Sequence, residues 1–169
     1  MLVIAAAVFD LRQRRIPNWL AVSGFVLGIA MNTFLFELPG LWTSLEGAGV
    51  ALLVYVPLFA LRAMGAGDAK LMAAVGAITG PMNWLGVLIL TSVFGGVLAD
   101  VLVLGKGRVR HTLGNLKLIL TSWRFRHLPY QLSPELDVGS EQALRLPHAV
   151  SILLGTVAFL VASAVWAPR

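Results

Sequence analysis

Apolar runs close to the length of a membrane span fill most of this sequence. Hydrophobic residues make up 58% of the 169 positions, only 12% are charged, and the mean hydropathy is +0.84. A water-soluble domain of this length carries charge on about a quarter of its residues, so lipid is expected to solvate most of this chain. We therefore expect an all-α fold, a polytopic membrane bundle of helices that forms a single domain over residues 1–169.

The apolar runs, read together with breaker residues, predict about six transmembrane helices. Their expected ranges are Met1 to about Leu11, Trp19–Phe36, about Leu45 to Leu61, Asp68–Thr79, Trp84–Leu104 and His148–Trp166. A turn at residues 80–83 separates the fourth from the fifth, because a Gly-Pro pair is a strong helix breaker. The first run is too short to cross a bilayer, so we expect this helix to be incomplete or its start to lie outside the sequence.

Basic residues indicate how this bundle is oriented. With six crossings, 12 of the 13 Lys and Arg residues fall on one side, most of them within residues 12–15 and 105–147. Lys and Arg concentrate in the cytoplasmic loops of membrane proteins, which predicts external termini and a basic cytoplasmic loop over residues 105–147. This placement accounts for the net charge of +5 without a nucleic-acid partner.

Part of that loop has the pattern of an amphipathic helix. Within residues 109–120, apolar positions recur at intervals of three and four residues. A basic helix of this kind tends to lie among lipid headgroups. Trp123 and Phe125, which alternate with Arg124 and Arg126, are expected to anchor it there.

Two aspartates stand out, because carboxylates at the edge of hydrocarbon are costly to keep and usually line a functional site. Asp10 follows the first apolar run, and Asp68 follows a loop in which Gly65 and Gly67 bracket an alanine. The expected topology places both at the cytoplasmic end of the bundle. Simpler interpretations remain open: a helix N-cap for Asp68, and for Asp10 an interfacial carboxylate neutralised by the neighbouring arginines.

Paired carboxylates have a specific chemistry. Two of them a few ångströms apart cannot both ionise cheaply, so the pair holds one proton near neutral pH. The ionised member then takes a proton from water while the protonated member donates to a scissile carbonyl, as in an aspartyl protease. No cofactor is needed, and no metal site is expected, because the chain has no cysteine and its three histidines show no metal-ligand spacing.

Three segments resemble the type IV prepilin peptidases, which are intramembrane aspartyl proteases with a Gly-x-Gly-Asp motif. These segments are Asp10 with Ile16-Pro17-Asn18, then Gly65-Ala66-Gly67-Asp68-Ala69-Lys70, and Arg145-Leu146-Pro147-His148-Ala149-Val150. The similarity is closest to the short TadV/CpaA-like branch that serves Flp-type pili. It implies that Asp10 and Asp68 are the catalytic residues. It also implies supporting or substrate-binding roles at the other motif positions: Asn18, Gly65, Gly67, Lys70 and His148.

The resemblance implies an endopeptidase that cleaves the basic leader from prepilins at the cytoplasmic face of the bacterial inner membrane. The implied partners are a prepilin, membrane lipids and the assembly proteins of a pilus or secretion system. Methylation of the product is not expected, because the chain has neither the cysteines nor the room for the insert of the large bifunctional members. His148 stands where family members more often have an aromatic residue. It either tunes the proton affinity of the pair or faces the headgroups at a helix start.

Two other functions fit an apolar chain with two membrane-edge carboxylates. A small proton- or ion-coupled transporter also uses such groups, although its acids are expected near the bilayer midplane. A non-catalytic membrane subunit of a pilus or secretion system would keep the fold without the activity. The presence of both aspartates argues against that alternative.

Overall fold

The computed structural model of the chain describes residues 1–107, 109–125 and 146–166. The helices in these ranges are α1 (Leu2–Gln13), α2 (Asn18–Ala60), α3 (Ala66–Gly105), α4 (Val109–Phe125) and α6 (His148–Trp166). The described residues contain no strand, so the prediction of an all-α fold is confirmed. Three of the helices, α2, α3 and α6, are long and apolar enough to cross a membrane.

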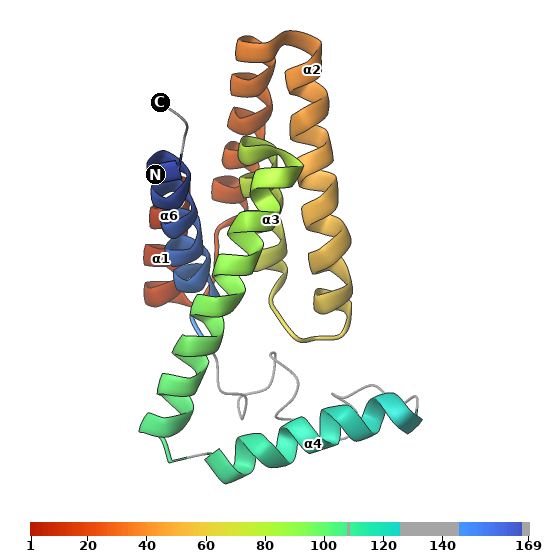
Figure 1. The fold of residues 1–169 in the computed structure, drawn as a ribbon, viewed down its shortest axis with the longest axis vertical. Helices are drawn as coiled ribbons and strands as arrows, with labels where there is room; N and C mark the ends of the chain where they lie inside the picture. Colours follow the sequence, from red (N-terminus) through yellow and green to blue (C-terminus); the bar gives the residue numbers. More distant parts are fainter. Residues whose placement is uncertain (108, 126–145, 167–169) are drawn as a thin grey trace.

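The long helices α2 and α3 each break at one residue and fold back on themselves (Figure 1). The backbone leaves the helical region at Glu37 in α2 (φ 55°, ψ −138°) and at Gly80 in α3 (φ 76°, ψ 170°). Pro39 follows the first break and Pro81 the second. Proline suits the first turn of a new helix, where its missing amide hydrogen is not needed. The expected break at the Gly-Pro pair is therefore confirmed at Gly80, but residues 81–83, expected as part of the turn, already belong to the second half of the helix.

The connection between the two halves of α2 is tighter than the sequence predicted. We expected a non-helical stretch between Phe36 and about Leu45, but only Glu37 departs from helical geometry. The prediction was wrong because Pro39 and Gly40 lie in the opening turn of the second half, where a proline begins a helix. Gly40 is buried, and a Cβ atom there would overlap the main chain across the hairpin, so the close turn requires a glycine.

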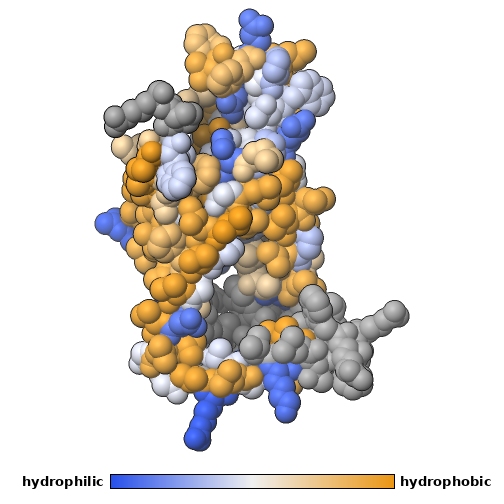
Figure 2. All heavy atoms as spheres, viewed as in Figure 1, coloured by the Kyte–Doolittle hydropathy of each residue, from blue (hydrophilic) through white to orange (hydrophobic). Residues whose placement is uncertain are grey.

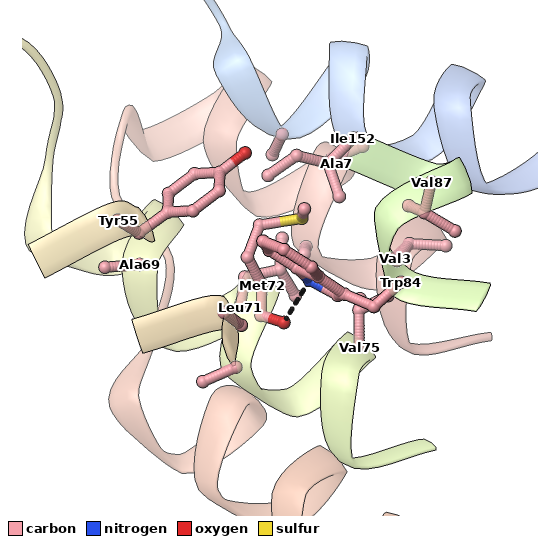
Figure 3. Close-up of a cluster of buried hydrophobic side chains, with 14 of the residues drawn as sticks. Val3, Ala7, Tyr55, Ala69, Leu71, Met72, Val75, Trp84, Val87 and Ile152 are labelled. Atoms are coloured by element: carbon pink, nitrogen blue, oxygen red, sulfur yellow. Dashed lines mark hydrogen bonds between the residues drawn. The ribbon is translucent and has the colours of Figure 1, made fainter. Parts of the chain in front are cut away.

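The first half of α3 forms the centre of the bundle. Seven consecutive residues, from Leu71 to Ala77, are buried, so neighbouring helices surround this segment on all sides. The largest buried side chains beside it are Trp84, from the second half of α3, and Tyr55, from α2 (Figure 3). The Trp84 Nε1–H donates a hydrogen bond of 3.1 Å to the carbonyl oxygen of Met72, which satisfies the indole inside the apolar core.

Direct contact between backbones joins α2 to α3. A Cβ atom on Gly47 would overlap the carbonyl oxygen of Gly76, and a Cβ atom on Gly76 would overlap that of Gly47. Small residues allow helices in lipid to approach this closely. The two segments run antiparallel (Figure 1), so Tyr55, eight positions after Gly47, lies level with Asp68, eight positions before Gly76. The glycine contact therefore sets the register that brings this tyrosine to the aspartate.

A polar network covers carbonyl groups that the break in α3 exposes. Pro81 has no amide hydrogen, so the carbonyl of Ala77 lacks the donor that a continuous helix would supply. The side-chain amide of Asn32 donates to the carbonyl oxygens of Ala77 (2.9 Å) and Ile78 (3.2 Å). It also donates to Ser44 Oγ (2.9 Å), and Ser44 itself donates to Ala77 (2.8 Å). Asn32 thus links both halves of α2 to α3.

The surface of the bundle is suited to lipid. Hydrophobic side chains cover most of the visible face between its two ends, and hydrophilic side chains gather toward the ends (Figure 2). Helix α4 lies crosswise to the bundle, below it in Figure 1, and occupies the range in which the sequence predicted an amphipathic helix. The rest of the predicted basic loop, residues 126–145, lies outside the described residues.

Candidate active site

Asp10 lies near the end of α1 and reaches across to α6. The helix ends at Gln13, and Arg14 follows in the left-handed conformation (φ 51°), with its amide donating to the carbonyl oxygen of Asp10 at 2.8 Å. The Asp10 side chain accepts a hydrogen bond at Oδ2 from the amide of Ala149, at 3.1 Å. This amide belongs to the first turn of α6, where backbone N–H groups have no partner within the helix. The carboxylate of Asp10 thus has a helix N-terminus as its partner rather than a neighbouring arginine.

Asp68 is the third residue of α3 and not its N-cap. The helix begins at Ala66, and Gly65 is the N-cap, with an extended backbone (φ −78°, ψ 149°). The N-cap interpretation of Asp68 was therefore wrong. Its carboxylate reaches back to accept a hydrogen bond from the backbone of Gly65, as acidic side chains at the third helical position do in capping boxes. A Cβ atom on Gly65 would lie 3.4 Å from Asp68 Oδ2, so the glycine leaves the carboxylate uncrowded.

The two carboxylates lie within electrostatic range of each other, and the charge of Asp10 acts on Asp68. Both side chains are partly buried, and they come from different helices, α1 and α3. Each also lies at a helix N-terminus: Asp10 at that of α6 and Asp68 at that of α3. A helix N-terminus favours a nearby anion. The arrangement therefore lowers the cost of one negative charge at this place, while repulsion disfavours a second.

Three other motif residues hold the loop that carries Asp68. Lys70 Nζ donates a hydrogen bond to Asn18 Oδ1 at 2.9 Å, which joins the start of α3 to the start of α2. Gly67 lies against Ile16, in the turn between α1 and α2, where a Cβ atom would come within 3.2 Å of the Ile16 Cβ. Through these contacts the glycine loop is fixed against the turn that follows Asp10.

His148 and Tyr55 extend the site from α6 and α2. The charge of Asp10 acts on His148, and the charge of Asp68 acts on Tyr55. The centroids of the two rings are 6.5 Å apart. His148 Nε2 is buried, and none of the residues that the structure describes forms a hydrogen bond with it.

The sequence drew attention to His148 but not to Tyr55 or to the amide of Ala149. A signal for Tyr55 was present, because it is one of only two tyrosines in the chain and brings a hydroxyl into an apolar run. The Ala149 amide is a backbone group, and its residue type gives no sign of its role.

The chemistry that these groups support is acid–base chemistry. A pair of interacting carboxyl groups, one ionised and one protonated, supplies a base and an acid at one place. Across the described parts of the chain, no three His, Asp or Glu side chains come together in a group that would hold a metal ion.

Comparisons with known proteins place the chain among leader peptidases. A model of the type IV leader peptidase family matches residues 1–99, the range that holds Asp10, Tyr55 and Asp68. The chain is 31% identical over 120 residues to the prepilin leader peptidase/N-methyltransferase of Xanthomonas campestris pv. campestris, over 65% of its own length. It spans 40% of the length of that relative. No solved structure matches the chain.

Proposed function

Since this chain belongs to the type IV leader peptidase family, we propose that it is a membrane-embedded aspartic endopeptidase that removes the basic leader from type IV prepilins. The observation that carries the proposal is that two carboxyl groups from different helices each lie at a helix N-terminus, Asp10 at that of α6 and Asp68 at that of α3, close enough for the charge of Asp10 to act on Asp68. We propose a Flp-type prepilin as the substrate, because the motif segments resemble the short TadV/CpaA-like branch. Methyl transfer is not part of the proposal, because the cysteine-bearing insert of bifunctional members has no counterpart in these 169 residues, which contain no cysteine.

The proposed membrane arrangement has six segments: α1, the two halves of α2, the two halves of α3, and α6. The breaks at Glu37 and Gly80 support it, because they divide helices of 43 and 40 residues into antiparallel halves. Residues 18–36, 38–60 and 81–105 are of bilayer length, whereas residues 66–79 form a shorter segment that is buried at the centre of the bundle. The basic residues then orient the bundle, with residues 105–147 as a cytoplasmic loop. In this arrangement Asp10 and Asp68 face the cytoplasm from the bacterial inner membrane, where lipids and pilus assembly proteins are further partners.

In the proposed reaction, a water molecule lies between the two carboxyl groups. The ionised aspartate takes a proton from this water, and the water oxygen forms a bond to the scissile carbonyl carbon. The protonated aspartate gives its proton to the carbonyl oxygen, so the intermediate is a neutral geminal diol. The first aspartate then protonates the nitrogen as the C–N bond breaks, and one diol hydroxyl returns a proton to the second. The pair finishes with the single proton it held at the start.

The surroundings of the pair fit this cycle. One negative charge remains on the two carboxyl groups throughout, and the N-termini of α3 and α6 stabilise it wherever it resides. The amide of Ala149 is a donor to Asp10, and the backbone of Gly65 is a donor to Asp68. Fixed donors of this kind need no reorganisation when a proton moves, which is how preorganised sites lower a barrier.

The direct test is Asp10→Asn and Asp68→Asn, which keep side-chain size but prevent either group from exchanging the proton. Each variant is expected to insert and accumulate like the wild type and to leave a co-expressed prepilin uncleaved. Cleavage is measured from the mobility of the prepilin and from the sequence of the product's new amino terminus.

Glu46→Gln is the matched control, because Glu46 is an exposed carboxylate of α2, beside Gly47 and away from the site. This variant is expected to cleave at the wild-type rate. Cleavage at that rate by Asp10→Asn or Asp68→Asn would exclude the paired-carboxylate mechanism.

A further inference from the structure

Tyr55 is held rigidly beside the aspartate pair. Its side chain is 2% exposed. The ring packs edge-on against Trp84, with centroids 6.2 Å apart, and lies 6.5 Å from the ring of His148. These contacts come from α3 and α6, so three helices fix the direction of the hydroxyl.

The hydroxyl of Tyr55 is free to bind a ligand. Figure 3 shows it pointing out of the apolar cluster and toward α6, with no hydrogen bond drawn to it. Within the part of the chain that the structure describes, no partner for this hydroxyl is found. The ring of Tyr55 is buried, but its hydroxyl oxygen is not among the fully buried polar atoms that lack a partner, so it stays accessible to a ligand. Among the described residues, the neighbouring His148 Nε2 is buried and has no hydrogen-bond partner.

The kind of group that would bind the Tyr55 hydroxyl follows from the surroundings of that hydroxyl. The charge of Asp68 acts on Tyr55, so the hydroxyl lies within reach of the place where the proposed reaction occurs. A peptide bond bound there presents a carbonyl oxygen, which accepts from a phenol, and an N–H, which an imidazole nitrogen accepts. The two groups, whose rings lie 6.5 Å apart, are thus complementary to one peptide bond.

We infer that Tyr55 is a catalytic residue that donates a hydrogen bond to the scissile carbonyl oxygen, an inference that rests on the proposed function. As the water oxygen bonds to the carbonyl carbon, the C=O π pair moves onto that oxygen, which gains negative charge until the protonated aspartate transfers its proton. Tyr55 keeps its own proton and stabilises this charge by a hydrogen bond that is stronger in the transition state than in the bound substrate.

The test is Tyr55→Phe, which removes the hydroxyl and retains the ring that packs against Trp84. Loss of one such donor lowers kcat by about 10²–10³ in a well-studied protease. Because the protonated aspartate still serves the same oxygen, we expect kcat to fall about tenfold to a hundredfold, with KM changed less than about twofold. The substrate is a synthetic peptide with a basic leader and the first residues of an apolar helix, cleaved by the full chain in nanodiscs.

A transition-state analogue gives a readout that does not depend on turnover. In this analogue, –CH(OH)–CH2– replaces the scissile –CO–NH– of the same peptide, so its hydroxyl occupies the position of the carbonyl oxygen. Its inhibition constant is expected to rise in Tyr55→Phe by about the same factor as kcat/KM falls. The thermal midpoint of Tyr55→Phe is expected to equal that of the wild type.

Val87→Ala is the matched control for packing. It removes a buried side chain of the same core on the side away from Tyr55 (Figure 3), so stability is expected to fall while kcat is retained. A Tyr55→Phe variant with wild-type kcat and wild-type affinity for the analogue would overturn the inference. If Asp10→Asn and Asp68→Asn abolish cleavage in the same assay, wild-type behaviour of Tyr55→Phe overturns only the role of Tyr55 and leaves the proposed function standing. If those two variants still cleave, or the wild type does not, the proposed function fails and the inference fails with it.

Discussion

Replacing Asn32 with leucine tests whether the turn in α3 depends on one side chain. Leucine has nearly the same size but no amide, so the variant loses the two N–H groups that Ser44 Oγ and the carbonyl oxygens of Ala77 and Ile78 share. Ala77 keeps the donor from Ser44, whereas the carbonyl of Ile78 loses its side-chain donor. Inside a bilayer, water cannot replace the amide as a donor to the Ile78 carbonyl, so losing the amide is expected to lower the free energy of unfolding.

The size of the effect follows from the number of bonds. Side-chain hydrogen bonds between membrane helices contribute about 0.6 kcal/mol each on average and about 1.7 kcal/mol at most. The amide has two N–H groups, so two bonds of average strength make about 1 kcal/mol and two of maximum strength make about 3 kcal/mol. We expect a loss of about 1–2 kcal/mol, since Ser44 still covers one of the two carbonyl groups.

The assay is equilibrium unfolding of the purified chain in bicelles, followed by circular dichroism. Ser92→Ala is the matched control, because the Ser92 side chain is exposed and its hydroxyl donates to the carbonyl oxygen of Leu88, one turn earlier in the same half of α3 (2.8 Å). It is expected to change the free energy of unfolding by less than about 0.5 kcal/mol. Equal stabilities of Asn32→Leu and Ser92→Ala would refute the argument that Asn32 compensates for the break in α3.

Two further substitutions probe the packing of the core. Gly76→Ala places a methyl group against the Gly47 carbonyl and is expected to destabilise the fold by about 2 kcal/mol or more. Gly49→Ala is the control, because a Cβ atom there meets open space, and it is expected to leave the stability unchanged. Equal thermal midpoints for the two variants would contradict the backbone contact between Gly47 and Gly76. Trp84→Phe removes the buried hydrogen bond to the Met72 carbonyl and is expected to cost about 1–3 kcal/mol. An unchanged unfolding midpoint in thermal denaturation would show that this bond contributes nothing net.

Local patterns were sufficient to locate most of the helices. His148–Trp166 was expected as a helix and is found as α6, because Pro147 and the apolar run mark its start and extent. The break at Gly80 was also expected, because Gly-Pro interrupts a helix in nearly any context. The second half of α2 was expected to begin at about Leu45, but it follows directly after Glu37. The contact across the hairpin, which allows so tight a turn at Gly40, is not a local feature of the sequence.

The site was predictable in part. Asp10 and Asp68 were expected at the same end of the bundle, since the count of spans and the positions of basic residues determine that. The environment of the pair was not predictable. Tyr55 comes level with Asp68 through the contact between Gly47 and Gly76, and many glycines in an apolar chain look alike until the helices are packed. The order of segments along the chain likewise does not reveal that α6 supplies a donor to Asp10.

The hydrogen bond from Ala149 to Asp10 has a consequence for biosynthesis. The two residues are 139 positions apart, so the carboxylate emerges from the ribosome long before the amide that stabilises it. Until α6 has entered the membrane, the nascent protein holds an acidic group without its intended electrostatic support. The proposed aspartate pair therefore has its full set of donors only after this late segment has been inserted.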